Sequence, residues 1–320
     1  NEITFLKAYL QYFLSHKLEI DLRENHWIIN GLQTYMIINY IEKFHSKENF
    51  LGRISGLGIM KAYSVSKIDF NGGFLLYSEF VQRANLQQSD ITPKDRLTRF
   101  NERIASPYHV GLGLKYLEES IGEKKLKKGI SDFIKDPMYS SFVESIQSNT
   151  KKNIDWFFDD YINRRESFDL SIENIELKND SITIEVLSKK GHIFPYTIGQ
   201  LKNDSLINLK WITPKTTSTE VTLKNLNSDY ISINPNLRLP ESNRSNNLKY
   251  VNRKIKPIQI NFFKDLESSK RNQIYYNPII NYNYYDGFSV GSRFYDKGIK
   301  MQKFTFDLMP EYSTNQATFV

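Results

Sequence analysis

The chain has 320 residues, of which 40% are hydrophobic and 25% charged, with 43 Lys and Arg against 36 Asp and Glu and no cysteine. The lack of cysteine excludes disulfides, thiol nucleophiles and cysteine-ligated metal clusters, and no apolar run is long enough to predict a transmembrane helix. The net charge of +7 is modest and is not gathered into a basic stripe, which argues against a nucleic-acid partner.

The first half of the chain has the periodicity of helices. Apolar residues recur at helical spacing over 3–14 and again over 28–41. A further stripe over 114–133 is interrupted at Gly122, and Asn153 can cap a last helix. We therefore predict one helical domain over residues 1–165.

The pattern changes to alternation after Arg165. Short runs at 168–172, 182–186, 221–223 and 231–233 place an apolar residue at every second position. This spacing predicts a small antiparallel β-sandwich. The polar stretch 235–247 is predicted to be a linker, so the second domain with its linker covers 166–247.

The remaining residues, 248–320, are rich in aromatic side chains. Between positions 271 and 320, 12 of 50 residues are Tyr or Phe. Apolar and polar residues alternate at 280–284 and at 304–308, and Asp286-Gly287 and Lys297-Gly298 are turn pairs. One apolar and one polar face is typical of a transmembrane β-strand and equally of a sandwich strand, so both interpretations remain open.

No catalytic apparatus is evident from residue chemistry. The five histidines are scattered without the spacing that places two imidazoles on one helix face. There is no nucleophile elbow, phosphate-binding loop or dinucleotide fingerprint. Glu24 and His26 are the nearest to a ligand pair, but two positions apart on a helix they point in different directions. We interpret them as a cap and a surface or half-buried histidine.

Residues 24–41 resemble a segment of the M1-family (gluzincin) zinc aminopeptidases. In that family a Trp-Leu-Asn-Glu-Gly-x-Ala-x-Tyr helix carries the third zinc ligand. Trp27, Gly31 and Tyr35 match this helix, and the ligand glutamate falls on Asn30.

Two further segments are similar to the same family, in the same order. Residues 106–134 resemble its Tyr-x-Lys-Gly segment and the helix pair that follows, which places the transition-state tyrosine on Tyr108, with Val110 in place of the usual Lys and Gly111 retained. Residues 152–162 resemble its Phe-Phe-x-x-Trp helix. The resemblance implies an α+β multidomain fold: the helical C-terminal half of a thermolysin-like M1 catalytic domain, a small antiparallel β-sandwich, and then truncated β-barrel-like strands.

The same resemblance implies that the zinc site is lost. In the family the third ligand follows the second histidine of a His-Glu-x-x-His helix by 19 positions, so the ligands fall on Lys7, Gln11 and Asn30 and the general base on Ala8. A lysine ammonium opposes a metal ion, and alanine cannot accept a proton from water. No cofactor is therefore predicted, although active family members hold zinc, and Tyr108 is left as a vestigial catalytic residue.

The C-terminal part resembles large M1-like proteins of Bacteroidota. Pro240–Asn246 is similar to their Pro-Glu-x-Asn-Arg-x-Asn linker, and Tyr285-Asp286-Gly287 to a motif of their outer-membrane barrel strands. This implies a chain truncated at both ends, because so few strands cannot close a barrel. It also implies a location in the cell envelope, in the periplasm or outer membrane of a Gram-negative bacterium.

Three functions remain open. The first is a non-catalytic peptidase homologue at the outer membrane that binds a peptide or protein partner. The second is an active zinc aminopeptidase that uses other ligands, such as Glu24 and His26. The third is an outer-membrane barrel for which the peptidase fold is an accessory domain. Whether the chain is an enzyme is undecided, and we expect this fragment to be inactive.

Overall fold

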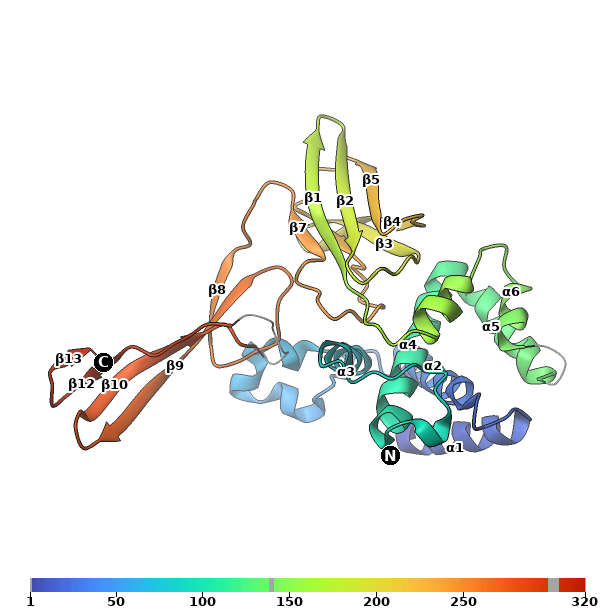
Figure 1. The fold of residues 1–320 in the computed structure, drawn as a ribbon, viewed down its shortest axis with the longest axis horizontal. Helices are drawn as coiled ribbons and strands as arrows, with labels where there is room; N and C mark the ends of the chain where they lie inside the picture. The colour runs from blue at the N-terminus through green and yellow to red at the C-terminus, as the bar shows by residue number, and fades with distance from the viewer. Residues whose placement is uncertain (1, 138–140, 299–304, 320) are drawn as a thin grey trace.

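The computed structural model describes residues 2–137, 141–298 and 305–319. It is a mixed α and β structure in which helices, a pair of stacked sheets and a separate long sheet follow one another along the chain. In Figure 1 the helices lie at the lower right, the stacked sheets at the top, and the long sheet extends to the lower left. None of the sheets formed by the described residues closes into a barrel.

The helical elements occupy the first half of the chain, as the periodicity predicts. They are α1 (Glu2–Lys17), α2 (His26–Phe44), the 3-10 segments η1 (Gly52–Gly56), η2 (Gly58–Ala62) and η3 (Ser64–Lys67), α3 (Gly72–Arg83), η4 (Lys94–Arg96), the π-helical η5 (Asn101–Ala105), α4 (Ser106–Ile121), α5 (Glu123–Lys135), α6 (Phe142–Gln147) and the π-helical η6 (Phe157–Ile162). Gly122 separates α4 from α5 with a φ of 101°, a conformation that only glycine adopts without strain.

Two antiparallel sheets follow and pack face to face. The three-stranded sheet has the order β1-β2-β5 and the four-stranded sheet the order β4-β3-β6-β7. Their strands are β1 (Leu170–Lys178), β2 (Ser181–Ser188), β3 (Tyr196–Lys202), β4 (Ser205–Ile212), β5 (Ser218–Lys224), β6 (Tyr230–Ile233) and β7 (Leu248–Tyr250). The alternating residues Ile182, Ile184 and Val186 are all buried, which is the reason for their period of two.

One hydrophobic core runs from the helices into the stacked sheets. Trp156 and Phe157 of the last helical turns, Phe168 before β1 and Ile184 of β2 belong to the same buried cluster. The helical half and the sandwich are therefore packed together through apolar side chains rather than joined only by the chain.

The segment 235–247, which the sequence predicts to be a polar linker, is packed against the body of the protein as a strap. Leu239 and Glu241 are both buried. The Glu241 carboxylate accepts hydrogen bonds from the Leu170 amide at 2.9 Å and from the side-chain amides of Asn234 and Asn247 at 3.0 and 2.6 Å. Composition is misleading here because the polar side chains are satisfied inside the protein rather than by water.

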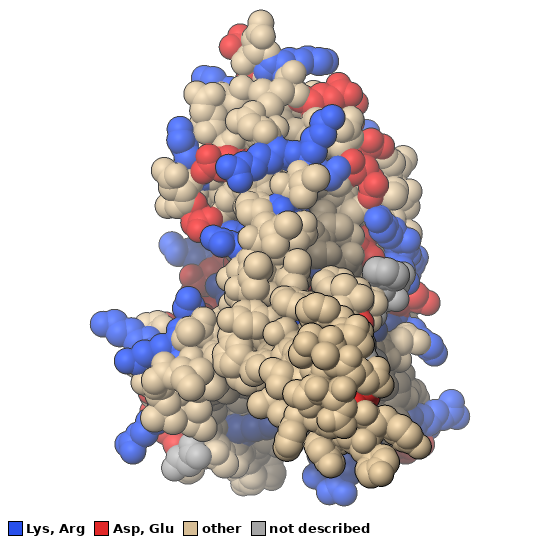
Figure 2. Space-filling view, turned by 90° about the vertical axis from the view of Figure 1, so that its left-hand side faces the viewer, with Lys and Arg blue, Asp and Glu red and all other residues tan. Residues whose placement is uncertain are grey.

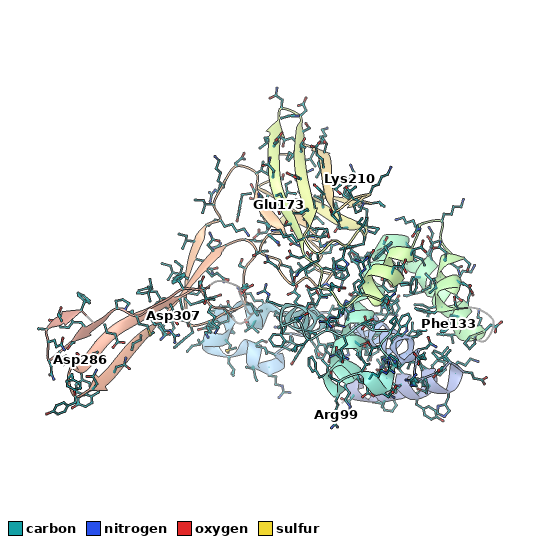
Figure 3. The ribbon with its side chains drawn as sticks, viewed as in Figure 1. Arg99, Phe133, Glu173, Lys210, Asp286 and Asp307 are labelled. Atoms are coloured by element: carbon teal, nitrogen blue, oxygen red, sulfur yellow. The ribbon has the colours of Figure 1, made fainter. Side chains whose placement is uncertain are left out.

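The C-terminal sheet has the order β13-β12-β10-β9-β8, with β11 also paired to β10. Its strands are β8 (Ile258–Phe262), β9 (Asn272–Asn283), β10 (Gly287–Tyr295), β11 (Asp307–Leu308), β12 (Glu311–Ser313) and β13 (Thr318–Phe319). The turn at Asp286-Gly287 joins β9 to β10 as predicted, and Asp286 lies at the far tip of the hairpin in Figure 3, whereas Asp307 lies near the body of the protein. The predicted turn at Lys297-Gly298 runs into residues 299–304, which lie outside the described residues together with Phe304.

Among the described residues, no helix combines the length and the apolar character needed to span a bilayer.

Candidate functional site

Helices α1 and α2 lie side by side and run in opposite directions. The Gln33 side chain of α2 donates a hydrogen bond to the Lys7 carbonyl of α1 at 2.6 Å. Leu10 packs with Ile37 and Ile41, in the later part of α2. The predicted zinc positions lie on these two paired helices.

The four positions that would carry the ligands and the base do not form a metal site. Lys7, Ala8 and Gln11 are exposed on α1, and Asn30 is half-buried on α2, where its carbonyl accepts a hydrogen bond from the hydroxyl of Thr34. An ammonium group and two amides do not provide the imidazole or carboxylate donors that zinc requires. The residues present therefore do not fit zinc.

Tyr108 lies in a different contact, between α4 and α3. Its half-buried ring meets Phe74 edge-on with centroids 4.7 Å apart and Tyr77 at 6.1 Å. Burial raises the pKa of the Tyr108 hydroxyl above its ordinary value. Within the described chain, no hydrogen bond or ring contact joins Tyr108 to Asn30. Phe74, which contacts Tyr108, also packs on the cluster of Leu10, Ile37 and Ile41.

The residues that carry the family resemblance are packing residues in this protein. A Cβ atom on Gly31 would lie 2.2 Å from Val110 Cγ1, and one on Gly111 would lie 2.5 Å from Thr34 Cγ2. Both glycines are therefore needed for the close crossing of α2 and α4. Tyr35 is also buried at this crossing. Packing at the crossing of α2 and α4 is therefore enough to explain the presence of these residues.

Glu24 and His26 do not form a ligand pair either. Glu24 precedes α2 and pairs with Arg23. His26 is buried at the start of α2 with both ring nitrogens unpartnered, and burial lowers its pKa. No group of three or more His, Asp or Glu that could hold a metal ion is present in the described residues.

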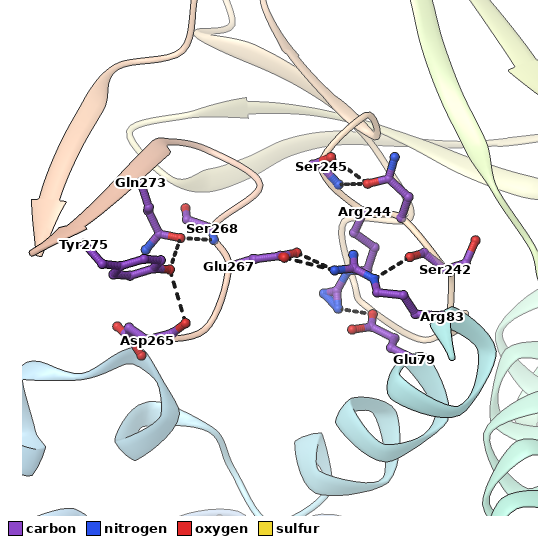
Figure 4. Close-up of polar contacts among 11 residues, drawn as sticks. Glu79, Arg83, Ser242, Arg244, Ser245, Asp265, Glu267, Ser268, Gln273 and Tyr275 are labelled. Carbon is purple, nitrogen blue, oxygen red and sulfur yellow. Dashed lines mark hydrogen bonds and ion pairs between the residues drawn. The ribbon is translucent and has the colours of Figure 1, made fainter. Parts of the chain in front are cut away.

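A cavity of about 370 Å³ lies elsewhere, between α3, the strap 235–247 and the chain that leads to β9. It is a feature that the sequence analysis missed, because its walls come from three distant segments. Figure 4 shows Glu79 and Arg83 of α3 in contact with Arg244, Ser242 and Glu267 of the later segments. The lining includes Leu75, Glu79 and Arg83 of α3, Leu237 and Arg244 of the strap, and Leu266 and Glu267.

Two ion pairs cross the wall of this cavity. Nη1 of Arg83 contacts both carboxylate oxygens of Glu267 at 2.9 and 2.8 Å, and its Nε donates to the Ser242 carbonyl at 2.7 Å. Arg244 pairs with the buried Glu79. Because each arginine faces a carboxylate, these pairs join the segments to one another and leave the cavity with balanced charge.

The largest unusual surface is the apolar face of the C-terminal sheet. The strand register places Phe288 opposite Tyr282 and Val290 opposite Ile280, so these side chains share one face. The face continues through Tyr312 on β12. Its exposed apolar members are Ile258, Ile260, Phe262, Tyr276, Ile280, Tyr282, Phe288, Val290, Phe294, Leu308, Tyr312 and Phe319. In Figure 2, which looks onto the sheet end of the molecule, this part is largely uncharged, with Lys and Arg at its rim.

The opposite face of the same sheet is polar. Asn281 donates hydrogen bonds to both carboxylate oxygens of Glu311 at 2.9 and 3.0 Å. Arg293 donates from Nε to Asp307 at 2.8 Å. The same face also carries Tyr275 and Tyr295, which are buried, so it is partly covered. Among the described residues, the face with Ile280 and Phe288 lacks the second layer that normally covers an apolar face.

Comparisons with known proteins do not assign the chain to a family. No protein-family model matches the chain, and no curated protein matches it. A solved aminopeptidase A from Legionella pneumophila, in complex with aspartic acid, is a weak structural neighbour, with 16% identity, a TM-score of 0.45 and 65% of this chain covered. The chain spans only 23% of that protein. A solved structure of residues 217–571 of S. aureus TarS aligns with 8% identity and a TM-score of 0.16. The alignment covers 95% of this chain and 76% of the TarS chain. At these TM-scores neither likeness bears on function.

Proposed function

We propose that this chain is a non-catalytic, peptidase-like module that is attached to a membrane through the apolar face of its C-terminal sheet. The observation that carries the proposal is the continuity of that face across the successive strands β8 to β13. A face of this extent in contact with water would be an aggregation surface, whereas lipid would cover it at a gain of about 25 cal/mol for each Å² removed from water.

The dimensions and chemistry of the longest strands agree with contact to lipid. A strand that spans a bilayer needs about 9–11 residues, and β9 has 12 and β10 has 9. Tyr284 and Tyr285 are exposed at the tip of the hairpin. Tyrosine rings are enriched where a membrane meets water, because one end of the ring is apolar and the other is polar.

The proposed membrane is the outer membrane of a Gram-negative bacterium. An open sheet cannot remain in hydrocarbon with unpaired edges, because each unsatisfied backbone group is costly there. Within the described residues, β8 forms one edge of the sheet, and β13 and β11 form the other. The sheet by itself is therefore proposed to rest its apolar face on the membrane, and full insertion would require additional strands that pair with these edges.

Vesicle flotation of the 320-residue chain tests the attachment. We expect the protein to float with phosphatidylcholine vesicles, and Ile280→Asn with Phe288→Asn to reduce the bound fraction several-fold. The matched control is Leu177→Asn with Leu206→Asn, two comparably exposed apolar residues of the sandwich. Equal flotation of all three proteins, or none for the unaltered chain, would contradict the attachment.

The non-catalytic part of the proposal rests on the side chains at positions 7, 8, 11 and 30. We expect no stoichiometric zinc by elemental analysis after dialysis against zinc, and no hydrolysis of aminoacyl substrates. Bound zinc together with hydrolysis would restore the active-enzyme alternative. If Glu24→Gln and His26→Gln then left the metal content unchanged, ligands other than these two would be implicated.

We further propose that the module binds a peptide or protein partner, and the cavity beside α3 is the candidate location. Its volume of about 370 Å³ is within the range of small-molecule sites, and its lining combines leucines with charged groups. Leu237→Trp would fill it from an exposed position. We expect this variant to lose binding of a fluorescent peptide library that the unaltered chain retains, and unchanged binding would exclude the cavity.

A further inference from the structure

The loop from Leu51 to Lys61 exposes aliphatic side chains that no part of the described structure covers. Its sequence, Leu-Gly-Arg-Ile-Ser-Gly-Leu-Gly-Ile-Met-Lys, folds into the short segments η1 and η2. Ile54 is 55%, Leu57 61% and Ile59 77% exposed. We call these three side chains the aliphatic tips of the loop.

The charges around the aliphatic tips have one sign. From Phe50 to Ile68 the sequence contains no Asp or Glu. It contains Arg53, Lys61 and Lys67, all three of which are exposed. Exposed aliphatic side chains interspersed with basic ones are complementary to a surface that combines hydrocarbon with anionic groups.

The loop is anchored next to the end of the C-terminal sheet that lies against the body. Tyr63, just after η2, donates its hydroxyl hydrogen to the Phe262 carbonyl at 2.9 Å. The Ser64 amide donates to the Asp265 carboxylate at 2.9 and 2.8 Å. In Figure 1 the blue helical turns between α2 and α3 lie beside the inner ends of β8 and β9. The segment that follows the aliphatic tips is therefore held beside the inner end of the sheet.

We infer that this loop docks on the surface of an anionic lipid bilayer. The aliphatic tips enter the boundary between headgroups and acyl chains, while the guanidinium of Arg53 and the ammonium of Lys61 bind lipid phosphates. Lipid suits the loop better than a protein groove, because the tips belong to short 3-10 turns with several glycines rather than to one rigid apolar face. The position of the loop relative to the bilayer rests on the proposed function, but its binding to lipid is a separate property.

A tryptophan placed in the loop measures insertion directly. The three native tryptophans are Trp27, Trp156 and Trp211, and the first two are buried. In Leu57→Trp, vesicles with phosphatidylglycerol should shift the added emission to the blue, and brominated acyl chains should quench it. Subtraction of the unaltered chain removes the native signal. An added emission that stays unshifted and unquenched would overturn the inference.

Affinity measurements separate lipid docking by the loop from attachment by the sheet. Ile54→Asn, Leu57→Asn and Ile59→Asn together should weaken binding to phosphatidylglycerol vesicles about tenfold or more. Arg53→Gln with Lys61→Gln should weaken it roughly fivefold for each charge removed and reduce its salt dependence. Leu206→Asn with Ile207→Asn, on the sandwich, is the control that should have no effect, and circular dichroism verifies folding.

Each combination of outcomes has a distinct meaning. If the loop variant binds less while the sheet variant Ile280→Asn with Phe288→Asn binds normally, the inference stands and the attachment by the sheet fails. If the loop variant binds as well as the unaltered chain, the inference is overturned, whatever the sheet variant does. If the loop variants lost binding to a protein partner but still bound vesicles, the inference would also be overturned.

Discussion

Gly31 and Val110 touch so closely that no side chain fits between them. A Cβ atom on Gly31 would lie 2.2 Å from Val110 Cγ1 and 2.9 Å from Val110 Cβ. The contact fixes the crossing of α2 with α4, and these two helices carry Asn30 and Tyr108. The resemblance to the peptidase family aligns Val110 with a position that is usually lysine. In this protein the position holds a buried apolar residue.

Gly31→Ala should destabilise the protein by about 1–3 kcal/mol because the added methyl group overpacks the crossing. Val110→Ala in the same chain should recover part of this loss, since it removes the atom that the methyl group meets. Urea unfolding monitored by circular dichroism gives both values. Gly56→Ala, where the structure leaves open space around the new Cβ atom, is the control. Equal effects at the two glycines would contradict the packing explanation.

Lys115→Met should be strongly destabilising because Lys115 neutralises a buried acidic cluster. Its ammonium lies 2.6 Å from Glu118, 3.1 Å from Glu42 and 2.8 Å from the Asn39 carbonyl oxygen. Removing one partner of such a buried pair costs about 3–5 kcal/mol, because the remaining carboxylate loses its counter-charge.

Lys127→Met is the matched control for that prediction. Lys127 pairs with Glu123 on the solvent side of α5, where an exposed pair contributes about 0–1 kcal/mol. Chemical unfolding of the two variants side by side measures the difference. A loss at Lys115 as small as that at Lys127 would show that the buried cluster is not neutralised by the lysine.

Glu241 should make stability depend on pH. Burial raises the pKa of its carboxyl to about 7, from an ordinary value of 4.5. A raised pKa in the folded state means that the contribution to stability is complete below about pH 4.5 and is lost as the pH rises through about 7. The total is on the order of 3 kcal/mol.

The measurement is the difference in unfolding free energy between the unaltered chain and Glu241→Gln at pH 5 and pH 8. A difference is needed because burial lowers the pKa of His26 and His192, which changes stability in the opposite direction over part of this range. Glutamine also leaves the Leu170 amide without its acceptor, but that cost is the same at both pH values. A difference that does not change with pH would contradict the prediction.

Arg83→Met should loosen the attachment of the chain before β9 without unfolding the helices. The Arg83 guanidinium binds Glu267 and the Ser242 carbonyl, so it ties α3 to two later segments at once. We expect faster amide exchange around residues 264–270 and little change in α2. Arg164→Met, which breaks a more exposed pair with Asp160, is the control. Unchanged exchange around 264–270 would contradict the role of Arg83.

Introducing the four zinc-site residues of the M1 family tests the proposed register that aligns them with positions 7, 8, 11 and 30. Lys7→His, Ala8→Glu, Gln11→His and Asn30→Glu together would supply two imidazoles and two carboxylates on the paired helices α1 and α2. We expect the variant to bind zinc at about one ion per chain, since this is a donor set that zinc accepts. The same variant with Asn30 left unchanged should bind more weakly. No zinc binding by the fourfold variant would contradict the register.

Local structure could be predicted from the amino-acid pattern alone. Helical spacing over 28–41 and alternation over 182–186 are direct consequences of which face each element buries, so α2 and β2 could be predicted from the pattern. The turn at Asp286-Gly287 could be predicted for the same local reason, since Gly287 adopts a positive φ of 68°.

The contacts between segments that are far apart in the sequence could be seen only in the three-dimensional structure. The segment 235–247 is polar in composition, yet Glu241 is buried because Asn234 and Asn247 come to it from either side. The cavity beside α3 combines Arg83 with Glu267, a pair 184 residues apart that no local pattern reveals. The apolar face of the C-terminal sheet likewise depends on strand register, because register alone decides whether the apolar residues of six strands fall on one side or on two.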